Sequence, residues 1–340
     1  MRSATASRTR ERIDRLAGAR LPWDAFAEEA LEIFARGVGF DAAVMAPMDR
    51  DTGLITGSIK RELPDDSYPH FARYEYVAPT PDAFAALAQR GNPVARLRDE
   101  TDGDPHRNAR FDEFLAPRLA IAHEIRVAAV EGEHLLGGMS LFRSVGASDF
   151  DESVTELARL LAPTLARGLR GGPRTGPAPR SSHAVLVVDA ANRLTASSAD
   201  ARSWVAILDP TGARPVPVPI VTAVTTARVH GVGELRIPST AAGWVRVRAT
   251  VVNDTVTRAP SVVVEVAAIT GREGARLNLT ALGLTRRERE IVDLVLDGAA
   301  TSEIARRLSL SPYTVQDHLK SVFAKAGLRS RRELVASLLG

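Results

Sequence analysis

The spacing of apolar residues predicts helices and strands in alternation over the first half of the chain. Residues 24–36 and 151–170 each place apolar side chains on one face at helical spacing. Between them, apolar runs twice flank turn-forming residues, so we expect one β-hairpin at 42–59 and another at 124–143. This pattern is typical of an α+β domain. The apolar stripe of the longer helix consists of Val154, Leu157, Leu160, Leu161, Leu165 and Leu169.

A second α+β segment is expected downstream. Apolar side chains at positions 245, 247 and 249 alternate with polar ones at 246, 248 and 250, which is the period-two pattern of a strand with one solvated face. Other short apolar runs nearby have the length of strands. The segment opens with residues 184–189 and 194–197 and ends in three expected strands, residues 233–238, 243–253 and 261–269.

Glycine and proline mark the boundaries of these segments. Residues 171–181 lack apolar periodicity and are dense in both residue types, which suits a linker. A weaker break follows the last strand. The predicted organisation is a domain at 1–170, a linker at 171–181, a domain at 182–268, a linker at 269–280 and a domain at 281–340.

Two capping boxes open helices in the last segment. Thr285 and Glu288 stand three residues apart, so each side chain is able to accept a hydrogen bond from the other's backbone N–H. Ser330 and Glu333 repeat this pattern. The segment therefore contains a helix that begins just after Thr285 and another that begins just after Ser330.

Two more helices lie between these. We expect Thr301 or Ser302 to cap the first of them. Ser311 then reads as the N-cap of the next helix, with Pro312 as its first residue, where the missing N–H of proline costs nothing. That helix should end at Gly327.

The helix from Pro312 to Gly327 has one apolar face and one polar face. A helix, a tight turn and a second helix with a free polar face is the helix-turn-helix arrangement. The inner face consists of Val315, Leu319, Val322 and Phe323. The outer face consists of Tyr313, Asp317, Lys320 and Ala324, with Gln316 and His318 on its flanks.

The same residues resemble a known family. Residues 284–290 (LTRRERE), 304–308 (IARRL), 311–319 (SPYTVQDHL) and 325–331 (KAGLRSR) closely resemble the LuxR-type DNA-binding domain. The resemblance covers about the last 60 residues. It implies an all-α four-helix domain that binds double-stranded DNA as a dimer through its third helix, with the fourth helix often forming the dimer contact.

The resemblance also implies roles for individual residues. Gln316, Asp317 and Lys320 would face base edges or phosphates in the major groove. A glutamine pairs with adenine and an aspartate accepts from the amino group of cytosine, but phosphate repels a carboxylate that meets no base donor. His318 would bond to the turn or to a phosphate. The phosphate contacts would be Thr314, Lys325, Arg329 and Arg331.

The two front segments resemble sensor folds. The second hairpin and the helix at 151–170 are similar to a GAF-type domain, and the stretch at 184–197 with the strands between 233 and 269 is similar to a PAS-type domain. The fold class expected is thus two α+β domains, GAF-like and PAS-like, followed by the LuxR-type domain. No residue defines a ligand, so we expect no bound cofactor. Dimerisation or docking of a partner is the alternative role for these segments.

Composition and charge sharpen this picture. The 340 residues include no cysteine, which excludes disulfides, thiolate zinc sites and a cysteine nucleophile. The net charge of +3 is small. However, residues 276–340 contain 11 Lys and Arg against 7 Asp and Glu, whereas the other 275 residues carry a net charge of −1. The basic excess therefore lies wholly in the segment expected to contact DNA.

An enzyme is not expected. His106, His123 and His134 lie near acidic residues but lack the spacing of a metal site, and no Gly-x-Ser-x-Gly sequence occurs. We also expect a cytoplasmic location without membrane contact, because no apolar run reaches about 18 residues and the first 20 residues lack the apolar core of a signal peptide.

The sequence therefore predicts a transcriptional regulator that reads the major groove as a homodimer under the control of its front domains. RNA polymerase and a small-molecule or protein signal are the further partners such a regulator would contact. Two alternatives stay open. In the first, the terminal helices form a protein-interaction module that does not bind DNA. In the second, residues 1–170 form a hydrolase.

Overall fold

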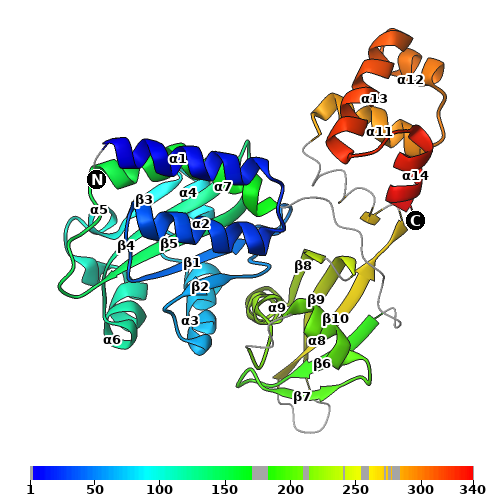
Figure 1. The fold of residues 1–340 in the computed structure, drawn as a ribbon. Helices are drawn as coiled ribbons and strands as arrows, with labels where there is room; N and C mark the ends of the chain where they lie inside the picture. The colour runs from blue at the N-terminus through cyan, green and yellow to red at the C-terminus, as the bar shows by residue number, and fades with distance from the viewer. Residues whose placement is uncertain are drawn as a thin grey trace. The chain divides into compact units, whose positions relative to one another are not determined.

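The computed structural model describes residues 3–170, 183–209, 214–239, 242–253, 260–271, 273–274, 277 and 284–339. The two α+β segments belong to one compact unit, and the C-terminal helices belong to another (Figure 1). The predicted linker at 171–181 and part of the one at 269–280 lie outside the described residues. None of the described helices has the length and apolar character needed to cross a membrane.

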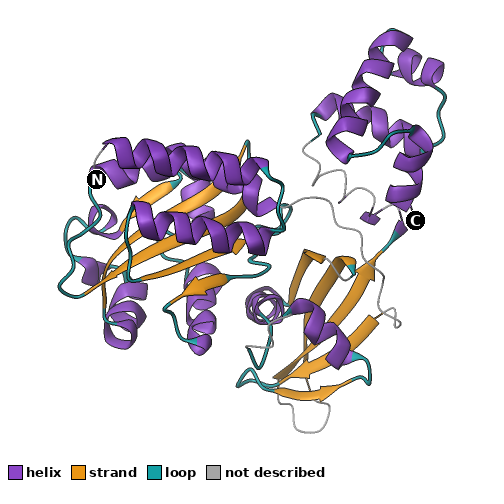
Figure 2. Cartoon of the chain, in the orientation of Figure 1, coloured by secondary structure: helices purple, strands orange, loops and turns teal. Residues whose placement is uncertain are grey.

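The first α+β domain is built on a five-stranded antiparallel sheet in the order β2-β1-β5-β4-β3. Three long helices lie along this sheet (Figures 1 and 2). The strands are β1 (Ala42–Pro47), β2 (Ile59–Arg61), β3 (Val94–Arg96), β4 (Ile121–Glu131) and β5 (His134–Ser144). The long helices are α1 (Ser3–Gly18), α2 (Trp23–Gly37) and α7 (Glu152–Arg170). Shorter helical segments are η1 (Asp65–Ser67), α3 (Tyr68–Ala72), η2 (Arg73–Val77), α4 (Phe84–Gln89), α5 (Leu97–Glu100), η3 (Pro105–Arg107), η4 (Phe111–Leu115) and α6 (Ala116–Leu119).

The three long helices and one face of the sheet enclose a common hydrophobic core. Helix α2 approaches α7 closely at Gly168, where a Cβ atom would lie 2.1 Å from the ring of Phe26. The predicted apolar stripe of α7 is buried except at Leu160, whose side chain is 47% exposed. Leu160 lies at the solvent edge of the stripe.

Both predicted hairpins are present, but the second strand of the first hairpin begins later than expected. The strands β4 and β5 pair as expected and turn at Gly132. In the first hairpin, however, β2 begins at Ile59, which pairs with Met45, and only the isolated bridge between Met48 and Ile55 precedes it. The strand predicted at 54–59 is thus mostly a loop.

A cluster of charged side chains is buried on the opposite face of the sheet from the long helices. Arg110 donates to Asp82 at 2.5 Å and lies 2.8 Å from Glu124, and its side chain is fully buried. Arg126 on β4 donates to Glu75 of η2. Three carboxylates thus face two guanidinium groups in a place where an unpaired charge is costly.

The second α+β domain has the same strand order as the first, β7-β6-β10-β9-β8. The alternation predicted for β9 is confirmed, because Val245, Val247 and Ala249 are fully buried. The expected fold class is confirmed for both front segments, each of which combines an antiparallel sheet with helices. The elements are β6 (His183–Val188), β7 (Leu194–Ser197), α8 (Ala201–Leu208), α9 (Val218–His230), β8 (Val232–Ser239), β9 (Gly243–Asn253) and β10 (Pro260–Ile269).

Helix α9 joins the two α+β domains. Val218 and Val221 of this helix belong to the same buried cluster as Met48 and Tyr68 of the first domain. The hydroxyl groups of Tyr68 and Thr222 lie 2.5 Å apart and share a hydrogen bond. The two domains therefore share a hydrophobic core.

Within residues 284–339, four helices form the C-terminal domain, as predicted. Their apolar faces meet in a core that includes Ile291, Val315, Leu319 and Val322. The helices are α11 (Arg286–Leu296), α12 (Thr301–Arg307), α13 (Pro312–Ala326) and α14 (Arg331–Leu339).

Candidate nucleic-acid interface

The turn between α12 and α13 sets the position of the predicted recognition helix. Ser309 adopts a left-handed conformation with φ of 53°, and the N–H of Leu310 donates to the carbonyl of Ala305 at 2.8 Å. The chain then re-enters a helix at Ser311, whose hydroxyl accepts from the backbone N–H of Thr314 at 3.0 Å. The predicted N-cap and the predicted end at Gly327, which is left-handed, are both confirmed.

The predicted cap of α12 is wrong. Ala300 occupies the N-cap position with an extended backbone, and no side chain caps the helix. Thr301 and Ser302 lie inside the first turn instead. The hydroxyl of Thr301 accepts a long hydrogen bond of 3.4 Å from the amide of Gln316, and so connects α12 to α13.

Glu288 connects the first and third helices of this domain. The capping box at Thr285 is present in both directions. In addition, the Glu288 carboxylate accepts from Ser321 at 2.6 Å and from Lys325 at 2.6 and 2.8 Å. Burial opposes ionisation of Glu288, but the hydrogen bonds from Lys325, Ser321 and the Thr285 backbone prevail and lower its pKa to about 2.

The capping box predicted at Ser330 is present in one direction. The Ser330 hydroxyl accepts from the N–H of Glu333 at 3.2 Å. The Glu333 carboxylate accepts from the N–H of Arg329, at 2.8 Å, rather than from Ser330. Hydrogen bonds at Arg329 and Ser330 therefore still fix the loop before α14 to the first turn of that helix.

The outer face of α13 projects polar side chains away from the core. Tyr313 is 73% exposed and the side chain of Lys320 is 72% exposed. The Lys320 ammonium lies 3.2 Å from the carboxylate of Asp317 and 6.0 Å from the centre of the Tyr313 ring. Gln316 and Asp317 are also exposed, so the side chains predicted to read bases share one free surface.

The residues predicted to contact phosphate are placed differently from one another. The Lys325 ammonium lies against Glu288, and the Arg331 guanidinium donates to the carbonyl of Ala299 at 2.5 Å. Thr314 shares a hydrogen bond with Ser311 at 2.8 Å. Arg329 is exposed and His318 is half-buried. Lys325 and Arg331 therefore hold the domain together, and their phosphate contacts stay a prediction.

Two features of this domain were missed by reasoning from the sequence. The structural role of Glu288 beyond its helix cap depends on Lys325, 37 residues later, and no local pattern signals this pair. Tyr313 was assigned to the outer face without a role. The structure places its ring 6.0 Å from the Lys320 ammonium, a neighbour that helical spacing does not by itself predict.

Two of the histidines considered for a metal site contact protein groups. His106 lies 2.7 Å from Asp112, and His123 lies 3.0 Å from the carbonyl of Ala147. His123 also lies 3.6 Å from the carboxylate of Asp149. Among the residues that the structure describes, no group of three or more His, Asp or Glu side chains is arranged to hold a metal ion. The clearest arrangement for binding a macromolecule is therefore the outer face of α13.

Sequence comparisons match the same helices to known regulators. The sequence model described as "Bacterial regulatory proteins, luxR family" matches residues 282–338. An HTH-type transcriptional regulator of Mycobacterium bovis is 54% identical over 52 residues, which are 15% of this chain and 6% of that protein. The spore germination protein GerE of Bacillus subtilis is 39% identical over 56 residues, which are 16% of this chain and 76% of that protein. The chain thus spans a small part of the mycobacterial regulator and most of GerE.

The chain has remote similarity to a solved structure over nearly its whole length. The crystal structure of Escherichia coli SdiA is 13% identical, and the comparison covers 97% of this chain and 95% of that one with a TM-score of 0.35. The sequence relatives match the C-terminal helices.

Proposed function

The chain belongs to the luxR family of bacterial regulatory proteins through its C-terminal domain, and on this premise we propose that it is a sequence-specific transcriptional regulator. It binds double-stranded DNA as a homodimer, with α13 of each copy in the major groove. The front domains control this binding in response to a signal. Location in the cytoplasm follows from this function.

The observation that supports the proposal best is the free outer face of α13. Gln316, Asp317 and Lys320 are exposed together on a helix that follows a tight turn, which is the geometry that places side chains against base edges. A helix face that only meets solvent would not require the preceding helix and tight turn that present this face. The capped start of the helix at Ser311 also fixes which residues point outward.

Charge on this face favours recognition over simple attraction. Asp317 lies 3.2 Å from Lys320 and offsets its positive charge. Phosphate alone would repel this carboxylate, whereas the amino group of a cytosine would bind it. The proposed reading of bases by Gln316 and Asp317 thus explains an acidic group on a surface that meets DNA.

The test is selection of binding sites from random double-stranded DNA by the full chain, followed by fluorescence anisotropy on the selected site. We expect an inverted repeat whose half-sites lie about one helical turn apart, because two recognition helices of a symmetric dimer meet one face of the duplex. Affinity should fall steeply with salt. Enrichment of no sequence over the starting pool at low salt would contradict the proposal and favour a protein-interaction module.

A further inference from the structure

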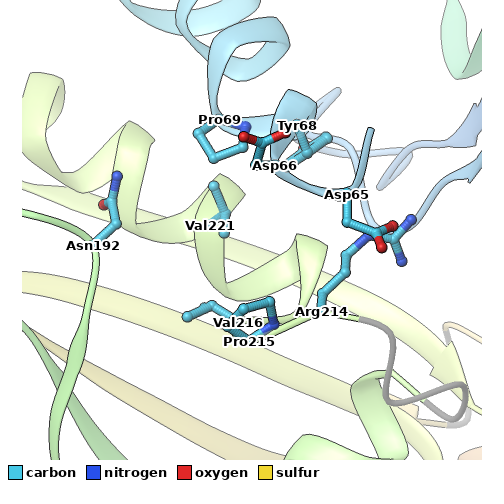
Figure 3. A pocket seen from close by; sticks show the side chains of 9 residues that line it. All are labelled: Asp65, Asp66, Tyr68, Pro69, Asn192, Arg214, Pro215, Val216 and Val221. Carbon is cyan, nitrogen blue, oxygen red and sulfur yellow. The ribbon is translucent and has the colours of Figure 1, made fainter. Parts of the chain in front are cut away.

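A pocket of about 270 Å³ opens between the first and second α+β domains (Figure 3). The first domain contributes residues of η1 and α3, including Tyr68 and Pro69. The second contributes the segment that leads into α9 and the first turns of that helix, including Arg214 and Val221. The volume lies just below the ~300–1,000 Å³ of pockets that hold drug-sized ligands, so it suits a smaller molecule.

Most of the wall is apolar. The Tyr68 hydroxyl is engaged by Thr222 at 2.5 Å, which leaves the aromatic ring to line the pocket. Val216, Val221 and Pro69 complete this surface. An apolar molecule in contact with these side chains would displace water from both domains at once.

Arg214 supplies the polar group. Its side chain extends from the second domain towards Asp65 of the first (Figure 3). Its Nε atom is buried and has no hydrogen-bond partner, and its Nη2 atom makes two long contacts of 3.4 Å with the carbonyl and hydroxyl oxygens of Ser58. A guanidinium has five N–H donors, so the described contacts leave most of its capacity unused. A buried donor without a partner is costly, and an incoming acceptor would remove that cost.

The acidic groups nearby are already matched or in water. The Asp65 carboxylate lies 2.5 Å from the Lys60 ammonium, and this hydrogen bond lowers the pKa of Asp65, with a smaller contribution from the charge of Arg214. Asp66 is exposed at the rim, where solvent screens its charge. Arg214 is half-buried and is therefore the charge that a bound molecule would meet.

We propose that this pocket binds a small carboxylate with an apolar body. The carboxylate pairs with the Arg214 guanidinium, and the body lies against Tyr68, Val216 and Val221. The use of this ligand as the signal rests on the proposed function, because a molecule held by both domains stabilises one arrangement of α9 against the first domain. Binding itself requires no DNA.

Isothermal titration calorimetry on the full chain tests the proposal with three probes of similar shape. These are phenylacetate, phenylacetamide and phenethylamine. We expect phenylacetate to bind at least tenfold more tightly than the other two, because only its charge complements the guanidinium. Arg214→Gln should remove this preference, and Val216→Trp should abolish binding by filling the pocket. The matched control is Arg202→Gln on the exposed face of α8, which should bind phenylacetate as the unmodified chain does.

Three results would overturn the proposal. They are no heat of binding with phenylacetate at millimolar concentration, equal affinity for phenylacetate and phenylacetamide, and tighter binding of phenethylamine. The comparison of probes on the unmodified chain decides the matter even if Arg214→Gln fails to fold. A Lys320→Ala variant separates the two proposals, since it should bind phenylacetate normally whatever its effect on DNA.

Discussion

The ammonium group of Lys325 lies 2.6 Å from one carboxylate oxygen of Glu288 and 2.8 Å from the other. Glu288 also closes the capping box of α11, so a single side chain fixes both the start of the first helix and the position of the third. The position of α13 depends on this contact together with the apolar core that α11 and α13 share. Loss of the contact should therefore affect both stability and recognition.

Glu288→Ala should destabilise the C-terminal domain by about 2 kcal/mol, since it leaves the half-buried Lys325 without its carboxylate and removes half of the capping box. Hydrogen exchange at the amides of α11 and α13, measured by mass spectrometry on the full chain, reports this local stability. The control is Glu290→Ala, whose ion pairs with Arg286 and Arg287 are more exposed. That variant should lose less than ~1 kcal/mol. Equal losses in the two variants would contradict the central role of Glu288.

The same carboxylate makes the domain sensitive to acid. Because the pKa of Glu288 is about 2 in the folded chain and near 4.5 ordinarily, its contribution is complete above pH 4.5 and is lost as pH falls from there towards 2. Glu288→Gln should be less stable at pH 7 and should lose less stability between pH 4.5 and 3. Circular dichroism during acid titration measures the difference, and parallel acid transitions would count against it.

The buried cluster of the first domain predicts the opposite dependence on pH. Burial raises the pKa of Glu75 to about 8 and that of Glu124 to about 7, against the attraction of Arg110. A raised pKa means that the folded chain binds the proton more tightly, so this contribution to stability is complete below pH 4.5 and is lost as pH rises through 7 to 8.

We therefore expect the melting temperature of the first domain to be lower at pH 9 than at pH 6. Glu75→Gln should reduce this difference, because it leaves two carboxylates for Arg110 and Arg126. Differential scanning calorimetry of the full chain measures the effect. Glu28→Gln, at an exposed position on α2, is the control and should keep the dependence of the unmodified chain.

Local signals in the sequence predicted most of the C-terminal domain. The caps at Thr285 and Ser311 and the apolar stripe of α13 are each contained within a few residues, so short-range chemistry determines them. Helix α1 was missed because its residues are mostly polar and its apolar face is narrow. Only Ile13 of that helix is a fully buried apolar residue of the core.

Contacts between distant residues were beyond such reasoning. Arg126 and Glu75 are 51 residues apart, and Tyr68 and Thr222 are 154 apart. The residues next to each side chain in the sequence do not indicate its partner, because these contacts form only when distant segments come together in the fold. The pocket at Arg214 arises in the same way, from segments that meet only in the folded protein.

Gln316 and Lys320 should differ in what they contribute to DNA binding. Lys320→Ala should weaken binding by a similar factor for all sequences and reduce the slope of affinity against salt by about one, since a phosphate contact releases about one counterion. Gln316→Ala should cost about 1–3 kcal/mol on the selected site and relax the preference at one base pair. Anisotropy titrations over a range of salt, combined with repeated site selection, measure both. The same sequence-independent loss in both variants would refute these roles.

Asp317 should lower affinity for DNA in general while sharpening the choice of sequence. Its carboxylate lies 3.2 Å from the Lys320 ammonium, so Asp317→Ala releases that charge and also removes a repulsion from phosphate. We expect tighter binding to random DNA, by several-fold at low salt, together with weaker discrimination at the base pair that Asp317 contacts. Asp293→Ala, at an exposed position on α11, changes the net charge equally and controls for long-range attraction. If Asp293→Ala raised affinity as much as Asp317→Ala, the effect would belong to overall charge rather than to the outer face of α13. If Asp317→Ala did not change affinity for random DNA and weakened binding only to the selected site, the predicted repulsion between Asp317 and phosphate would be wrong. The carboxylate would then act only through its contact with a base.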